Sequence, residues 1–238
     1  MILSQTSNRV MEYQFFLGID AVSATEGKGV DVALTLVEKE EAADNDDAPT
    51  YRLHRLEEGT AMEDAGDVAD HVQSLLTQQP FVARTVLTVN RTEAAGQAVF
   101  RALADRGLAA IGAEFTAGTS AVSGSTDEMN AAVSAFSAVD TLTNLYRGGH
   151  LDLAPLQEKK ITSHLVHSLQ QVGSNDAAEG ETASVRHELP TTPSDAGYDP
   201  LLMSAALACW MGEEQSFDPL QHLKTQPDGV GHDKRGAV

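Results

Sequence analysis

Three acidic side chains stand where strands or helices are expected to begin or end. Asp20 ends a buried apolar run, Glu93 follows a second such run, and Asp199 stands before an apolar helix. Two-metal hydrolysis of a phosphodiester bond needs several carboxylates around a pair of ions. Oxygen ligands of this kind suit Mg²⁺ or Mn²⁺. Asp20, Asp199 and Glu93 are therefore candidate catalytic residues.

The candidate metal ligands are Asp20, Asp199 and Asn90, and each also has a purely structural interpretation. Asn90 stands at a strand end where a metal site would need a carboxylate, and an amide oxygen is a neutral, weaker ligand. Asp20 can cap a turn, Asn90 or Thr92 can cap the next helix, and Asp199 before a proline is an ordinary N-cap. The sequence leaves both interpretations open.

The histidines show no zinc-like spacing. His164 and His167 lie three residues apart on one expected helix face, without an evident acidic or cysteine partner, so we expect them to face solvent. The single cysteine, Cys209, excludes an intrachain disulfide and a cysteine-based zinc site. The sequence also contains no Walker motif, nucleophile elbow or calcium-loop spacing.

The first half of the chain predicts an α/β arrangement. Alternating, β-branched segments predict a three-strand antiparallel meander at 13–20, 30–37 and 51–56. Helical and extended patterns then alternate, with helices at 63–79 and 92–105 and strands at 84–89 and 108–113. Strand–helix–strand connections imply parallel pairing with right-handed crossovers.

The second half is expected to be mainly helical. Apolar periodicity predicts helices at 130–146, 156–172 and 200–211, with a short extended piece at 151–153 and an edge strand at 184–189. The segment 173–183 is acidic and rich in small residues, which favours mobility. We expect a flexible N-terminus over 1–12, one domain over 13–214 and a disordered tail over 215–238.

The charge of the chain is strongly negative, at −19 over 238 residues, with 35 acidic and 16 basic residues. Such a surface repels nucleic acid unless metal ions or a local basic patch screen it. One hypothesis for the acidity is a salt-rich cytoplasm. No stretch approaches the roughly 20 apolar residues that cross a bilayer, so we expect a cytoplasmic protein that does not enter the membrane.

The strand and helix order resembles that of the ribonuclease H-like fold: an α/β fold with a mixed five-stranded sheet flanked by helices, here with a helical second half. Three segments, at 16–20, 87–99 and 198–210, are further similar to the nuclease domain of phage terminase large subunits. The apolar helix that ends in Trp210 is the most distinctive of them. The resemblance spans roughly residues 13–214 and implies a phage or prophage protein related to DNA packaging.

Departures from the family pattern accompany this resemblance. Asn90 replaces the second acid, and the paired acids of the third segment are reduced to Asp199, which Tyr198 and Pro200 flank. Losing a charged ligand weakens a metal site, because carboxylates neutralise the ion as well as orient it. The resemblance therefore implies either a Mg²⁺- or Mn²⁺-dependent endodeoxyribonuclease that binds DNA, or a weakened or inactive derivative.

Two alternatives remain open at this point. The first is a non-catalytic module on the same fold that binds a protein partner, which the negative charge favours over free DNA. The second is a nucleotide-binding fragment of the actin or sugar-kinase type, which would need a glycine-rich phosphate loop after the first strand. The sequence fixes neither the oligomeric state nor the partner.

Overall fold

The structure is a computed structural model and describes residues 15–24, 29–40, 49–116, 130–154, 156, 159–177, 195 and 197–214. The expected N-terminus at 1–12, edge strand at 184–189 and tail at 215–238 lie outside these residues. In chain order the elements are β1 (Phe15–Ser23), β2 (Val30–Glu40), β3 (Thr50–Met62), α1 (Ala65–Leu76), β4 (Thr85–Asn90), α2 (Ala94–Asp105), β5 (Ala110–Thr116), β6 (Asn130–Ser134), α3 (Ala135–Arg147), β7 (Leu151–Asp152), α4 (Lys159–Ala177) and α5 (Pro200–Glu213).

The strands form one mixed sheet in the order β6-β5-β4-β1-β2-β3-β7. The first three strands pair as an antiparallel meander, and β4 and β5 add to β1 in parallel. The five expected strands thus lie in the order 3-2-1-4-5, which is the arrangement of the ribonuclease H-like fold. The α/β class with this mixed sheet is confirmed, and β6 and β7 widen the sheet beyond the five strands expected.

Several expected boundaries were wrong. Residues 130–134 form β6 rather than the first turn of a helix, because they pair in parallel with the edge of β5. The following helix begins at Ala135, where the Ser134 hydroxyl accepts a hydrogen bond from the Ser137 amide and caps it. The first strand continues past Asp20 to Ser23, still paired with β2. The fourth helix extends as far as Ala177, into the segment 173–183 that was expected to be mobile, and the rest of that segment lies outside the described residues.

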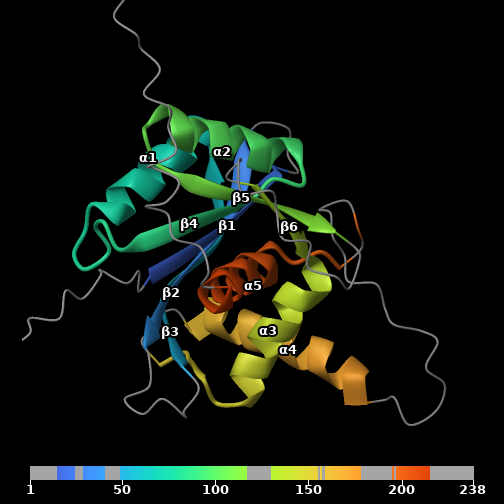
Figure 1. The fold of residues 1–238 in the computed structure, drawn as a ribbon. Coiled ribbons are helices and arrows are strands. Elements are labelled where there is room, and N and C mark those ends of the chain that lie inside the picture. Colours follow the sequence, from blue (N-terminus) through green and yellow to red (C-terminus); the bar gives the residue numbers. More distant parts are fainter. Residues whose placement is uncertain are drawn as a thin grey trace, which may run out of the picture.

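Helices cover both faces of the sheet. The helices α1 and α2 lie on one face, and α3, α4 and α5 lie on the other, as Figure 1 shows. Side chains of β1 alternate between the two cores: Phe16 packs on the α5 side, whereas Phe15 and Leu17 pack on the α1–α2 side. This alternation directs Asp20, four residues after Phe16, to the α5 side of the sheet.

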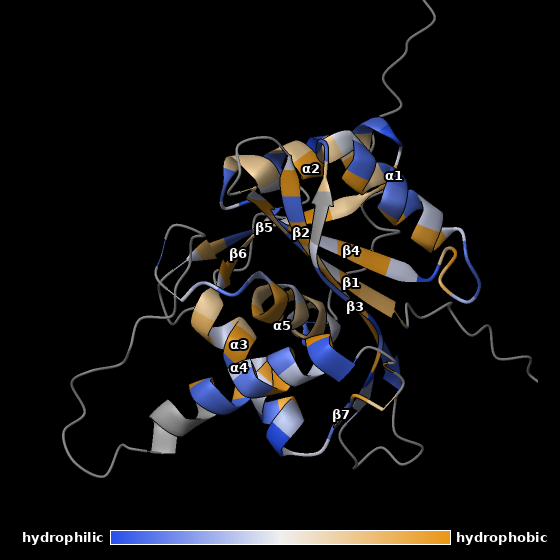
Figure 2. Cartoon of the chain, turned by 180° about the vertical axis from the view of Figure 1, so that it is seen from behind, coloured by the Kyte–Doolittle hydropathy of each residue, from blue (hydrophilic) through white to orange (hydrophobic). Residues whose placement is uncertain are grey.

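The helix α5 is buried along almost its whole length between the sheet and the helices α3 and α4. Twelve of its fourteen residues, from Leu201 to Gly212, are buried, and in Figure 2 α5 is mostly hydrophobic in colour while α4 carries polar residues. Gly18 allows α5 to approach β1 closely, because any side chain at this position would collide with the helix. A Cβ at Gly18 would lie 2.0 Å from the Ser204 carbonyl oxygen. The opening of α5 is thereby positioned near the end of β1.

None of the helices within the described residues combines the length and the apolar character that crossing a membrane would require.

Candidate functional site

Two neighbouring parallel strands bring Asp20 and Asn90 together. The parallel register of β1 and β4 runs to the pair Ile19–Val89, so Asp20 and Asn90 each follow the last paired residue. Both side chains are buried, with exposed fractions of 0% for Asp20 and 3% for Asn90. The candidate site at the ends of β1 and β4 therefore has polar side chains at its centre, and these side chains are closed to solvent.

Hydrogen-bond donors occupy both oxygens of the Asp20 carboxylate. The Asn90 amide donates from Nδ2 to Oδ1 at 2.8 Å, and the Tyr198 hydroxyl donates to Oδ2 at 2.6 Å. The same Asn90 Nδ2 also donates to the Tyr198 hydroxyl oxygen at 3.0 Å. These three side chains form a closed hydrogen-bonded triangle, which we call the Asp20 lock.

The orientation of the Asn90 amide is fixed by its other end. Its Oδ1 accepts hydrogen bonds from the Thr92 backbone amide at 3.0 Å and from the Thr92 hydroxyl at 2.6 Å. A hydroxyl can turn, but a backbone N–H can only donate, so the amide oxygen must face Thr92 and the NH₂ group must face Asp20. Asn90 is therefore a donor toward Asp20. Its carbonyl oxygen caps the turn that leads into α2.

Burial raises the pKa of Asp20 from its ordinary value of 3.8 to about 6, because the charged form loses its hydration. The hydrogen bonds from Tyr198 and Asn90 lower the pKa and offset part of this effect. The pKa of the Tyr198 hydroxyl is raised, first by burial and then by the negative charge of Asp20. Tyr198 therefore stays protonated and keeps donating to Asp20 at neutral pH.

Glu93 lies near the lock. It stands at the N-cap position of α2, where its side chain makes no capping hydrogen bond. Its negative charge contributes to the raised pKa of Asp20. The structure thus brings Asp20, Asn90 and Glu93 to one end of the sheet, as the strand order suggested.

Asp199 makes its contacts elsewhere. Its Oδ1 accepts from the backbone amides of Leu201 and Leu202 at 3.0 and 3.1 Å, which is the N-cap arrangement at the start of α5. Its Oδ2 accepts from the Ser168 hydroxyl of α4 at 2.5 Å. Because neighbouring side chains in an extended segment point to opposite sides, it is Tyr198 and not Asp199 that contacts Asp20.

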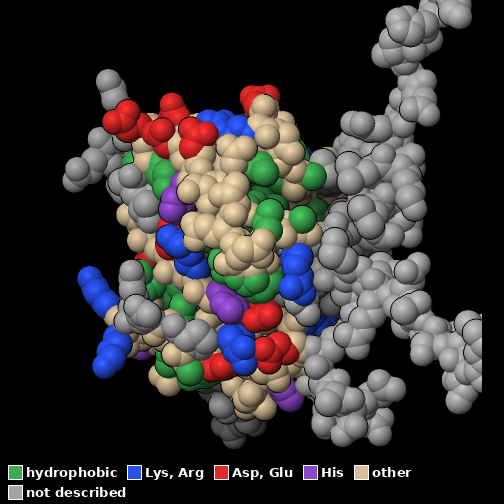
Figure 3. Space-filling model, turned by 90° about the vertical axis from the view of Figure 1, so that its left-hand side faces the viewer, with side chains coloured by type: hydrophobic (Ala, Val, Ile, Leu, Met, Phe, Trp, Pro, Cys, Tyr) green, Lys and Arg blue, Asp and Glu red, His purple; other side chains and the backbone are tan. Residues whose placement is uncertain are grey.

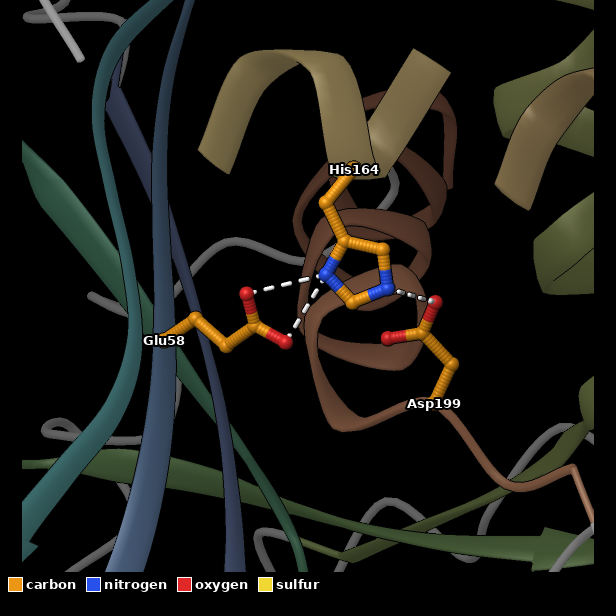
Figure 4. Close-up of side chains that lie close together, drawn as sticks. All are labelled: Glu58, His164 and Asp199. Atoms are coloured by element: carbon orange, nitrogen blue, oxygen red, sulfur yellow. Dashed lines mark hydrogen bonds and ion pairs between the residues drawn. The ribbon is translucent and has the colours of Figure 1, made fainter. Parts of the chain in front are cut away.

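A second polar cluster surrounds Asp199 (Figure 4). The imidazole of His164 lies between two carboxylates, with Nδ1 at 2.8 Å from Glu58 Oε1 and Nε2 at 3.6 Å from Asp199 Oδ2. The hydrogen bond to Glu58 raises the pKa of His164, and the charge of Asp199 adds to the rise. One ligand atom from each of the three residues lies within 4.8 Å of the others, so this cluster could hold a metal ion. The expectation that His164 has no acidic partner was wrong.

Comparisons with known proteins identify no family. No protein-family model matches the chain, and no curated protein matches it. Among solved structures, RuvC from Thermus thermophilus is similar, with a TM-score of 0.35 and 15% sequence identity over 85% of this chain and 97% of that chain. Likeness at this TM-score adds nothing to the interpretation that the strand order already gives.

The Asp20 lock does not fit a divalent metal pair. A metal ligand must turn a lone pair toward the ion, but Asn90 and Tyr198 turn hydrogens toward Asp20. Asp20 itself is fully buried, and Asp199, the third candidate ligand, makes its contacts with Ser168 and His164 rather than with Asp20. As arranged, the lock can stabilise the joint between β1, β4 and α5, but it cannot hold two ions.

Three residues of these clusters were not predicted as site residues from the sequence. Glu58 and His164 are 106 positions apart and carry no shared motif, so only the three-dimensional fold brings them together. Tyr198 carried a signal, because it is a polar aromatic residue that flanks a candidate acid at the start of a buried helix. A partly buried tyrosine hydroxyl usually finds a hydrogen-bond partner, which here is Asp20.

Proposed function

We propose that this chain is a non-catalytic member of the ribonuclease H-like fold that works by binding a protein partner. The single observation that carries the proposal is the Asp20 lock. The carboxylate that metal-dependent enzymes would use at this strand end is sealed from solvent and hydrogen-bonded to two donors. Asp20 thus serves the joint between two strands and a helix rather than a reaction.

The surface charge supports a protein partner over free DNA. The chain carries a net charge of −19, and binding to the phosphate backbone relies on Lys and Arg. On the face drawn in Figure 3, basic side chains are interspersed with acidic and apolar ones and do not form a single basic patch. A mixed surface of this kind suits recognition between proteins, where charge sets orientation and specificity.

The biological setting that we propose is phage or prophage DNA packaging, in the cytoplasm. The support is the resemblance of three segments of the chain to the nuclease domain of terminase large subunits. In that interpretation Asn90 stands at a position where the family carries an acid, and it has become a donor to Asp20. The chain would then have kept the fold for assembly and lost two-metal cleavage.

Replacing Asn90 by aspartate tests the loss of the metal site. In Asn90→Asp one oxygen can still accept from Thr92, while the other takes the place of Nδ2, 2.8 Å from the Asp20 carboxylate. Two carboxylates in such contact repel each other unless a proton or a cation lies between them. We expect the variant to unfold at a lower temperature than wild type at neutral pH, and millimolar Mg²⁺ to restore much of the loss.

The matched control is Asn144→Asp on α3, because Asn144 Nδ2 donates to Asp140 at 3.1 Å in an exposed pair. In water this pair is screened, so we expect little destabilisation and little response to Mg²⁺ at constant ionic strength. Wild type should show no Mg²⁺ response that depends on Asp20 and no Mn²⁺-dependent nicking of plasmid DNA. Nicking by wild type that disappears in Asp20→Asn would overturn the proposal and establish a metal-dependent nuclease.

A further inference from the structure

We propose that Glu58, His164 and Asp199 form a binding site for one divalent transition-metal ion, separate from the Asp20 lock. The three side chains come from β3, α4 and the start of α5, and their ligand atoms lie within 4.8 Å of one another. An imidazole nitrogen with two carboxylates is a donor set that suits Zn²⁺, Co²⁺ or Mn²⁺ better than Mg²⁺. The site does not depend on the proposed function.

The geometry needs only a modest adjustment to close on an ion. Metal–ligand bonds of about 2.0–2.2 Å separate neighbouring ligand atoms of a tetrahedral site by about 3.3 Å. The two contacts of the imidazole, 2.8 Å from Nδ1 to Glu58 and 3.6 Å from Nε2 to Asp199, lie on either side of that spacing, and a single ion would take one of these two nitrogens. The side chains of His164 and Glu58 are 42% and 32% exposed, so they can rotate to bring one ring nitrogen between the carboxylates.

Asp199 provides the fixed side of the site. Its side chain is 15% exposed, and the Ser168 hydroxyl and two backbone amides hold its oxygens in place. Carboxylates that bind metals are usually held by such outer hydrogen bonds, which orient the remaining lone pairs. The exposed side of His164 leaves open positions for water or for a ligand atom from a partner protein.

Without an ion, the same three groups form a different arrangement. His164 protonated on both nitrogens would donate to Glu58 from Nδ1 and face Asp199 with Nε2, which satisfies both contacts of Figure 4. The ion and the second proton are alternatives, because a metal needs a free lone pair on one nitrogen. The experiment must therefore separate a metal site from a protonated histidine that bridges two acids.

Co²⁺ is a suitable probe, because its visible absorption depends on its ligands. We would titrate the full chain with Co²⁺ at constant ionic strength and count the bound metal by equilibrium dialysis and elemental analysis. We expect one equivalent that Zn²⁺ displaces. His164→Gln and Glu58→Gln should each weaken its binding by at least about tenfold, since loss of a residue that only supports a ligand already has an effect of this size.

Two variants serve as controls. His167→Gln removes a histidine on the same helix that contacts Gln171, and Asp20→Asn alters the lock. Both should keep the Co²⁺ equivalent, while circular dichroism confirms that all variants are folded. Equal Co²⁺ binding by wild type, His164→Gln and Glu58→Gln would overturn the proposal, because the ion would then be held by the acidic surface in general. No bound equivalent in wild type would overturn it too and leave the protonated bridge.

Discussion

Replacing Asp20 by asparagine should remove a loss of stability that the wild-type protein undergoes as the pH rises toward neutrality. Burial raises the pKa of Asp20 from 3.8 to about 6, so the folded chain holds this proton over a pH range in which the unfolded chain has released it. Stability therefore falls as pH rises through this range and stays low above it. A shift of about two units corresponds to about 3 kcal/mol. Asp20→Asn keeps a neutral side chain of the same shape and therefore avoids this pH dependence. Its NH₂ group must face one of the two donors, and the cost of that contact is the same at every pH.

The assay is urea unfolding followed by circular dichroism, for wild type and Asp20→Asn, at several pH values. As the pH rises from about 4 to about 7, the free energy of unfolding of the variant should increase by about 3 kcal/mol relative to that of wild type. This corresponds to a relative shift of roughly 6–12 °C in melting temperature for a chain of this size. The control is Asp105→Asn, an exposed acid at the end of α2. Parallel pH profiles for wild type and Asp20→Asn would refute the reasoning that burial dominates the pKa of Asp20.

Two further substitutions test the joint between the sheet and α5. Tyr198→Phe removes the 2.6 Å hydrogen bond to Asp20 and should lower the free energy of unfolding by about 1–3 kcal/mol at neutral pH, with a further rise in the Asp20 pKa; an unchanged unfolding curve would contradict the lock. Gly18→Ala places a Cβ against the Ser204 backbone and should destabilise the fold by about 3 kcal/mol or more. Gly107→Ala, at a positive φ of 72° with open space around it, should cost only about 1–2 kcal/mol, and equal melting temperatures for the two alanine variants would show that α5 does not press on β1.

Much of the fold could be predicted because its signals are local. Alternating β-branched residues give the meander, and apolar periodicity gives α1 and α2. Pro200 after Asp199 gives the start of α5, since proline suits a first helical turn and aspartate caps it. Residues 130–134 were wrongly predicted to be helical, because a short run of small and apolar residues before a helix has the same pattern as the helix itself. Only the free edge of β5 makes this run a strand.

The candidate site was predictable only in part. The proximity of Asp20 and Asn90 follows from parallel strands that end side by side, which sequence order implies. The direction of a side chain in an irregular segment does not follow from sequence, so Asp199 was expected where Tyr198 lies. The pairing of His164 with Glu58 depends on how α4 packs across β3, and neither segment carries a signal for that packing.

The most direct test of the account is to follow the carboxyl carbon of Asp20 by nuclear magnetic resonance as the pH changes, with and without millimolar Mg²⁺. We expect a titration midpoint at about 6 that Mg²⁺ does not move, because donors already occupy both oxygens. A midpoint near the ordinary value of 3.8, or one that Mg²⁺ lowers, would contradict it. Asp20 would then be an open metal ligand rather than the centre of a lock.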